Sequence, residues 1–387
     1  MTDEKDWKDL IIADLGKVVT GKTPSTSNPE YFGGDIPFVT PTDMDGRRII
    51  STTERYLTEM GANAVKGSKL PEKSVIVSCI GSQMGKVAIV GKPCVTNQQI
   101  NAIVVSPEYS ELFVYYSLSL RGDEIRYIGS GSAVPILNKS DFSNLPIAIP
   151  PLPEQRAIAG ILGALDDKIE LNRRMNRTLE AMARAVFRHW FVENEEVESW
   201  KVGKLGDLVT LINERVDATP QKDNEKYIAL DDMPSKSIDL SQYRLGSEVN
   251  SSIISFKRGD ILFGSMRPYF HKVGIAPFDG ITRTTTFVLR PKKDIFRAFA
   301  LYWFFSDEVI EFSTTASVGT TIPYVRWETL ENYEIPIPSH SLMEKFTKFF
   351  QPLWLKIVSN GKQSRTLAAL RDALLPKLMS GEVRVRP

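Results

Sequence analysis

The segment GKVVTGKT, from Gly16 to Thr23, has the residue types and spacing of a phosphate-binding loop, G-x-x-x-x-G-K-[ST]. Such a loop binds phosphate only if a helix begins at its lysine, because the free amides of the helix N-terminus must face the anion. Here the loop is followed by PSTSNPEYFGG from Pro24, a stretch that favours turns over a helix. We therefore expect no nucleotide site, and ATP binding at Lys22 remains only an alternative.

Other patterns with catalytic potential are weaker still. Asn28-Pro29-Glu30-Tyr31 resembles the Asn-Pro-Pro-Tyr signature of adenine methyltransferases, but glutamate replaces a proline that the signature needs. His189, His271 and His340 are scattered along the chain and have neither metal-ligand nor nucleophile spacing. We therefore predict a protein with no catalytic residue, no metal site and no cofactor of its own.

The composition is that of an ordinary globular protein, with 42% hydrophobic and 25% charged residues in a chain of 387. This length predicts two or three domains. The charged start MTDEKDWKDL does not fit a signal peptide, and Cys79 and Cys94 fit buried, reduced thiols. We therefore expect a cytoplasmic protein.

An internal duplication runs along the chain. The segment LGKVVT from Leu15 recurs as LGDLVT from Leu205, and LPIAIP from Leu145 recurs as YEIPIP from Tyr333. Each half begins with short β-branched and aromatic runs punctuated by Gly, Pro, Asn and Asp, which predict strands and tight turns. The runs 74–80, 86–90 and 101–105 are expected strands, and 110–120 and 296–312 are expected helices. Each half therefore begins with a mixed α/β head that ends in a proline-rich strap.

After each strap the hydrophobic spacing alternates between four and three residues, which is the pattern of a coiled-coil seam. Adding 188 to the seam positions of the first half gives those of the second, and polar residues interrupt both copies at the same two places. Two core helices that merely share ancestry are the alternative, but matched polar positions favour two helices that pack on each other. The predicted seam residues are Ile158, Leu162, Leu165, Ile169, Asn172 and Leu179, with Phe346, Phe350, Leu353, Ile357, Asn360 and Leu367.

These features predict an α+β protein with two tandem heads, each followed by a long helix. Two equivalent halves can be related by a local two-fold axis, which would make the two helices an antiparallel coiled coil with pseudo-two-fold symmetry. The seam would be about 50 Å long at ~1.5 Å per residue. The expected boundaries are 1–150 for the first head, 151–197 for the first helical spacer, 198–338 for the second head and 339–387 for the second spacer.

The sequence resembles the specificity subunits of type I restriction-modification systems, the HsdS family. The segment VPILNKSDFSNLPIAIPPLPEQRAIAGIL from Val134 carries the resemblance most clearly, and TGKTPSTSNPEYFGGDIPFVTPTDM from Thr20 adds to it. The second strap departs from the pattern, since LPEQ at 152–155 becomes LMEK at 342–345.

The resemblance implies two target-recognition domains that each read half of a split sequence in double-stranded DNA. It also implies assembly with two methyltransferase subunits and with restriction (translocase) subunits. S-adenosylmethionine, ATP and Mg would belong to those partners, whose chemistry is adenine methylation and ATP-dependent cleavage. This chain would be the non-catalytic subunit, with no membrane partner.

One turn in each head is the best candidate for base contacts. Gln83 has the side chain to pair with adenine, and Arg267 to pair with guanine, while Tyr269 can pack on bases or sugars. Two solvated turns that have simply drifted apart are the alternative. The full set of candidate DNA-binding residues is Lys22, Ser82, Gln83, Lys86, Asn97 and Gln98 in the first half, and Arg267, Tyr269, His271, Lys272 and Arg283 in the second.

The formal net charge of +1 argues against DNA binding, because phosphate neutralisation usually gives nucleic-acid binders a basic excess. Either the basic residues gather on one face, or partner subunits supply the phosphate contacts. A structural adaptor with two globular heads on a coil, which binds proteins and never DNA, therefore remains the main alternative function.

Overall fold

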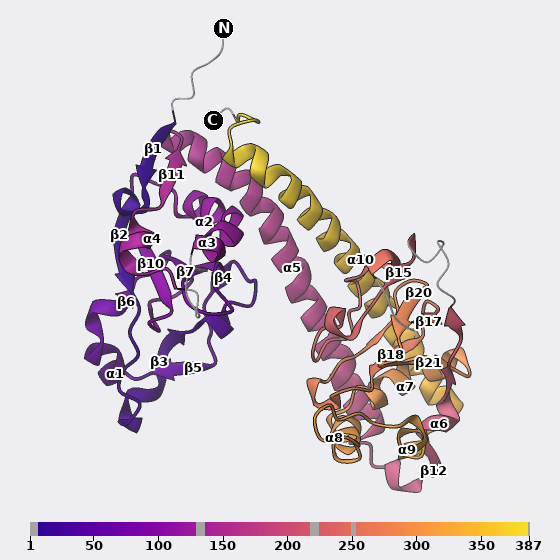
Figure 1. The fold of residues 1–387 in the computed structure, drawn as a ribbon. Helices are drawn as coiled ribbons and strands as arrows, with labels where there is room; N and C mark the ends of the chain where they lie inside the picture. Colours follow the sequence, from indigo (N-terminus) through magenta and orange to yellow (C-terminus); the bar gives the residue numbers. More distant parts are fainter. Residues whose placement is uncertain (1–6, 129–135, 217–223, 249–252, 386–387) are drawn as a thin grey trace. The chain divides into compact units, whose positions relative to one another are not determined.

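The computed structural model describes residues 7–128, 136–216, 224–248 and 253–385. The chain divides into two compact units. The first contains Met1–Asp167 and Ala368–Pro387, and the second contains Lys168–Leu367. Each unit therefore holds one head together with a part of each of the two long helices, α5 (Leu152–Phe191) and α10 (His340–Met379) (Figure 1).

The first head is built on a five-stranded sheet in the order β2-β10-β7-β8-β4. Its centre is the β-branched run of β7, whose four residues are all buried. The strands are β2 (Gly16–Thr20), β10 (Ile100–Val105), β7 (Val75–Ser78), β8 (Val87–Val90) and β4 (Ile49–Ile50). A four-stranded sheet comprises β5 (Arg55–Leu57), β3 (Phe32–Val39), β9 (Cys94–Thr96) and β6 (Lys69–Leu70), and a two-stranded ribbon pairs β1 (Lys8–Ile11) with β11 (Pro146–Ile149). The helices are α1 (Glu59–Ala64), α2 (Glu111–Leu120), α3 (Gly122–Ile128) and α4 (Lys139–Ser143).

The second head repeats this plan with a four-stranded sheet in the order β13-β21-β18-β19. Its strands are β13 (Val209–Ile212), β21 (Thr286–Pro291), β18 (Ile261–Gly264) and β19 (Val273–Ile275). A five-stranded sheet comprises β14 (Arg215–Val216), β17 (Ile253–Phe256), β20 (Gly280–Arg283), β15 (Lys226–Tyr227) and β16 (Arg244–Leu245), and the ribbon pairs β12 (Lys201–Lys204) with β22 (Glu334–Ile337). The helices are α6 (Leu205–Leu208), α7 (Arg297–Phe304), α8 (Asp307–Thr315) and α9 (Trp327–Leu330).

Strand register confirms the duplication. It also shows that the alignment of LGKVVT from Leu15 with LGDLVT from Leu205 is wrong by three residues, because Val18 pairs with Ile103 whereas its counterpart Leu211 pairs with Leu289. In the first head Ile100 lies opposite Ser78, and in the second Thr286 lies opposite Gly264, so both pairs are related by an offset of 186 (286 − 100 and 264 − 78). The three predicted strands in the first head are confirmed as β7, β8 and β10. The helix expected at 110–120 is confirmed as α2, which Ser110 caps by accepting a hydrogen bond from the amide of Phe113.

The single helix expected at 296–312 is wrong. It is two helices, α7 and α8, because Ser306 has extended backbone angles and caps α8 by accepting a hydrogen bond from Val309 N. The apolar run continues through the break because α7 is buried on nearly all sides and α8 buries one face, both in the core of the same head.

The predicted pairing of the long helices is confirmed within each unit. In the second unit Asn172 Nδ2 donates to the carbonyl oxygen of Asn360 at 3.4 Å, and Asn176 Nδ2 donates to that of Ile357 at 3.2 Å. In the first unit Arg371 Nη1 donates to Asp166 Oδ1 at 2.6 Å. The partner number on α10 falls as the number on α5 rises, so the helices are antiparallel.

All twelve predicted seam residues are buried or half-buried. Continued past Leu179, the alternating spacing predicts Val186 and Trp190 as further seam positions. Near the end of α5, however, the most buried residues are Phe187 and Phe191, each one residue beyond the predicted position. The reason is that this end of the helix also packs on its head, where Phe191 lies 4.9 Å from Phe299 between ring centroids.

Candidate nucleic-acid interface

All six candidate residues of the first head lie at one edge of its five-stranded sheet. The strands β2 and β7 both end at this edge and β10 begins there, because Thr20 pairs with Asn101 and Ser78 pairs with Ile100. The loops that follow β2 and β7 and the turn that precedes β10 therefore converge. Together they carry Lys22, Ser82, Gln83, Lys86, Asn97 and Gln98.

The turn between β7 and β8 presents Ser82 and Gln83 to solvent. Gly81 and Gly85 have positive φ values of 80° and 88°, a conformation that glycine adopts without strain. A Cβ atom on Gly85 would also lie 2.2 Å from the carbonyl oxygen of Gly122, so no side chain fits there. The turn is therefore held close to α3, with its polar tip free.

The turn before β10 divides its polar residues between structure and surface. Asn97 is buried, and its amide is engaged within the turn, since Nδ2 donates to Gln99 Oε1 at 2.9 Å and Oδ1 accepts from Gln99 N at 3.1 Å. Gln98 is exposed, and its Oε1 accepts from Thr23 Oγ1 at 2.7 Å. This contact connects the turn to the loop of Lys22, which is also exposed.

The second head has the same edge, where β13 and β18 end and β21 begins. The loop after β18 contains a short 3-10 helix, Pro268–Phe270, between Arg267 and His271, which both have left-handed backbone angles. Tyr269 and Phe270 are 50% and 42% exposed, and their ring centroids lie 4.8 Å apart. The two rings form an exposed aromatic pair at the tip of the loop.

The charged candidates of this head differ in how exposed their side chains are and in whether they are already hydrogen bonded. Arg283 is exposed at the end of β20, and Arg267 is half-buried with its amide bonded to the carbonyl oxygen of Pro323 at 2.7 Å. Lys272 Nζ donates to the carbonyl oxygen of Leu230 at 2.8 Å, so its ammonium group is already engaged.

His271 lies inside the head rather than at its surface. Its side chain is 4% exposed, Nε2 lies 2.9 Å from the carbonyl oxygen of Phe305, and Nδ1 lies 3.5 Å from Asp307 Oδ1. Burial lowers the pKa of this imidazole, so the neutral ring donates through Nε2. His271 thereby anchors the loop that presents Tyr269.

Glu180 supports the same loop from α5. Its Oε1 accepts from Ser237 Oγ at 2.7 Å and from Ile238 N at 3.2 Å. The neighbouring Ser235 Oγ donates to the carbonyl oxygen of Phe270 at 2.7 Å. Burial raises the pKa of Glu180 to about 7. Sequence reasoning missed this residue, because an acidic residue next to the seam position Leu179 reads as solvent-facing.

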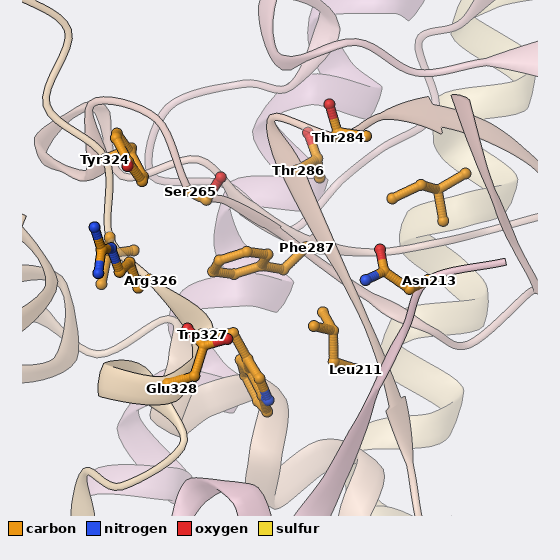
Figure 2. A pocket seen from close by; sticks show the side chains of 12 residues that line it. Leu211, Asn213, Ser265, Thr284, Thr286, Phe287, Tyr324, Arg326, Trp327 and Glu328 are labelled. Carbon is orange, nitrogen blue, oxygen red and sulfur yellow. The ribbon is translucent and has the colours of Figure 1, made fainter. Parts of the chain in front are cut away.

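Sequence reasoning also missed a hollow at this edge. Its volume is about 310 Å³, and Phe287 lies in the middle of the side chains that line it, with Arg326 on one side and Asn213 on the other (Figure 2). The other lining residues are Leu211, Ile254, Ser265, Thr284, Thr286, Tyr324, Val325, Trp327 and Glu328. No motif considered in the sequence marked this hollow.

The segment that matched a phosphate-binding loop is strand β2 followed by coil, so no helix begins at Lys22. No group of three or more His, Cys, Asp or Glu residues in the described ranges could hold a metal ion. Both cysteines are free and buried, and burial raises the pKa of Cys79 to about 11 and of Cys94 to about 12. No helix in the described part of the chain is both long and apolar enough to cross a membrane.

Comparison with known proteins gives a consistent result. A family model described as the type I restriction modification DNA specificity domain matches residues 4–181 and again 197–364. The chain is 30% identical over 420 residues to the type I restriction enzyme MjaIX specificity subunit of Methanocaldococcus jannaschii, covering 98% of this chain and 94% of the relative. It is 39% identical over 150 residues to the HindI specificity subunit of Haemophilus influenzae, covering 38% of this chain and 32% of the relative.

A solved structure has the same fold. The crystal structure of a type I restriction-modification system S subunit from M. genitalium superposes with a TM-score of 0.61 at 18% identity, covering 98% of this chain and 97% of that one.

Proposed function

Since this chain belongs to the family of type I restriction-modification specificity subunits, we propose that it is the subunit that selects the DNA sequence on which such a complex acts. We further propose that the target is bipartite, with one half-site read by each head. The supporting observation is that both heads gather loops at the same edge of an equivalent sheet, while the tips of those loops differ in chemistry.

The difference between the tips is what two readers of different half-sites need. The first head presents the exposed amide of Gln83, which matches the paired donor and acceptor of adenine. The second presents Arg267 and the exposed ring of Tyr269, which suit guanine and an apolar base or sugar surface. A shared scaffold with divergent tips therefore supports sequence reading over a purely structural role.

Under this proposal the chain is not catalytic. Methyltransferase and restriction subunits would assemble with it and supply S-adenosylmethionine, Mg and ATP chemistry. A formal net charge of +1 fits this division, because partner subunits would then provide many of the phosphate contacts. The net charge of +1 is equally consistent with the adaptor alternative. A DNA-binding experiment distinguishes the adaptor from a DNA-reading subunit.

The decisive experiment is sequence-resolved DNA selection by the chain co-purified with its methyltransferase partner at a stated salt concentration. We expect a split motif, in which Gln83→Ala alters one half and Arg267→Ala alters the other. If the complex selects a split motif that neither change affects, the base contacts are made by other residues at the two edges. Selection of random sequence by a correctly assembled complex would refute DNA reading and leave the adaptor.

A further inference from the structure

The two heads differ most sharply at one pair of equivalent positions. In the first head Asn101 lies opposite Val77, and in the second Phe287 lies opposite Phe263, with the same offset of 186 (287 − 101 and 263 − 77). Asn101 and Phe287 therefore occupy the same place on one scaffold, and their surroundings can be compared directly.

In the first head this place is closed. Asn101 is 3% exposed, and both ends of its amide are satisfied within the head. Thr20 Oγ1 donates to Asn101 Oδ1 at 2.7 Å, and Asn101 Nδ2 donates to the carbonyl oxygen of Leu137 at 3.3 Å. The three residues form a bonded set that leaves no polar group for a ligand.

In the second head the same place is open. Phe287 cannot replace the hydrogen bonds of Asn101, and it forms the floor of the 310 Å³ hollow. Asn213 takes the place of Thr20, because Ile212 pairs with Val288 and the next residue falls beside Phe287. Among the described residues the side chains of Asn213 and Arg326 have neither a hydrogen bond nor an ion pair, and both are exposed.

A buried hydroxyl in the hollow also lacks a partner. Thr286 is 1% exposed, and within the described chain its Oγ1 has no hydrogen bond. The first head has the apolar Ile100 at this position. Such a hydroxyl is not special to the second head, because Ser78 Oγ and Thr96 Oγ1 of the first head are also buried without a hydrogen bond among the described residues. The difference between the two places therefore lies in Asn213, Arg326 and Phe287.

We propose that this hollow receives the edges of neighbouring base pairs in the half-site of the second head, and that Asn213 and Arg326 read them. The inference rests on the proposed function, because it takes duplex DNA as the ligand. Asn213 offers both a donor and an acceptor, which suits adenine, and Arg326 offers paired donors, which suit guanine. Phe287 lies between them as an apolar surface for a thymine methyl group.

The lining favours a base edge over a phosphate. A phosphate needs donors alone, whereas the amide of Asn213 also presents an acceptor oxygen. The aromatic floor of Phe287 and its neighbour Trp327, whose ring centroids lie 6.0 Å apart, would repel a phosphate from the centre of the hollow.

The test is DNA selection by the complex of this chain with its methyltransferase partner, repeated for Asn213→Ala and Arg326→Ala. Both residues are exposed, so the variants should fold, and their thermal unfolding is compared with that of the wild type. Arg258→Ala is the matched control, since it removes an exposed arginine near the opposite end of β18. The half-site of the first head is an internal control in every selection.

We expect each hollow variant to lose about tenfold or more of its discrimination at one or two positions of one half-site, with the other half-site unchanged. The control variant keeps both half-sites. Two results would overturn the inference and leave the proposed function intact. One is that both hollow variants select the same half-sites as the wild type. The other is that they bind all sequences more weakly by the same factor, with the base preference unchanged. If the wild-type complex selects no motif, the proposed function itself fails.

Discussion

Asn172 and Asn360, which occupy equivalent positions in the two halves of the chain, are hydrogen bonded to each other within the helix pair. Asn172 Nδ2 lies 3.4 Å from the carbonyl oxygen of Asn360, and Asn360 Nδ2 donates in turn to Asn176 Oδ1 at 2.9 Å. Asn172 and Asn360 are 1% and 2% exposed. The polar interruption predicted from the sequence is thus a direct contact between the two copies, located where a local two-fold axis would relate them.

Asn360→Ala should destabilise the protein by about 1–3 kcal/mol, because it leaves Asn176 Oδ1 buried without that donor. Urea unfolding would measure the change. In the double variant Asn176→Ala/Asn360→Ala the cost should be smaller than the sum of the two single costs, since neither partner is then left unpaired. Additive costs would show that the pair is not coupled.

The buried carboxyl of Glu180 should make stability depend on pH. Its pKa in the folded protein is raised to about 7 by burial, above the usual value of 4.5, so the folded state holds a proton that the unfolded state has lost. Stability should therefore fall as pH rises from about 4.5 to about 7 and then level off.

Glu180→Gln removes this titration and keeps an acceptor oxygen for Ser237 and Ile238. Relative to the wild type, the variant should gain on the order of 2–3 kcal/mol between pH 5 and pH 8. Urea unfolding of both proteins across this range tests the point. Parallel curves would mean that Glu180 is ionised in the folded protein throughout.

Asp166 should be far more important for stability than its neighbour Asp167. Its carboxylate accepts from Tyr116 Oη at 2.6 Å and from Arg371 Nη1 at 2.6 Å, and its side chain is 10% exposed. Asp166→Ala should cost about 3 kcal/mol or more, because it leaves buried donors without an acceptor. Asp167 pairs with Arg48 Nη2, but its side chain is 71% exposed and Arg48 Nη1 also donates to Tyr116 Oη and to the carbonyl oxygen of Gly163. Asp167→Ala should therefore cost less than about 1 kcal/mol. Equal costs in thermal unfolding would contradict this assignment.

Gly85→Ala should damage the first head specifically. The positive φ of Gly85 and the carbonyl oxygen of Gly122 both exclude a side chain, so the turn that carries Gln83 must shift. We expect a lower Tm and an altered half-site for this head, with the other half-site retained. Gly160→Ala is the control, because Gly160 lies in α5 with no atom within 4 Å of an added Cβ. That change should leave Tm the same or raise it.

The sequence was sufficient for the elements whose signal is periodic. The seam from Ile158 to Leu179 repeats over several turns, and its second copy confirms every position by the same offset. The convergence of the candidate loops at one edge was not predicted, because it depends on the order of the strands in each sheet. The sequence did not reveal that three candidate DNA contacts, Asn97, His271 and Lys272, have polar groups that are engaged within their own heads.

Other parts depend on contacts between residues far apart in the chain. The hollow forms because β13, β21 and the segment at Tyr324–Glu328 meet, and no local pattern reports a free volume among them. Ser306 ends one helix and begins another within an unbroken apolar run, so periodicity could not reveal it. Glu180 is buried by a loop more than fifty residues later in the chain.

Residues from both ends of the described chain contribute to one hydrophobic cluster. Trp7 and Val385 both lie against the core of the first unit, and Arg384 Nε donates to Glu154 Oε1 at 2.8 Å. Leu378, near the end of α10, is part of the same core and is 2% exposed. The first unit therefore combines residues up to Asp167 with residues from Ala368 onward, and the whole second unit lies between them in the chain. During synthesis the core of the first unit can be completed only after the second head has been made.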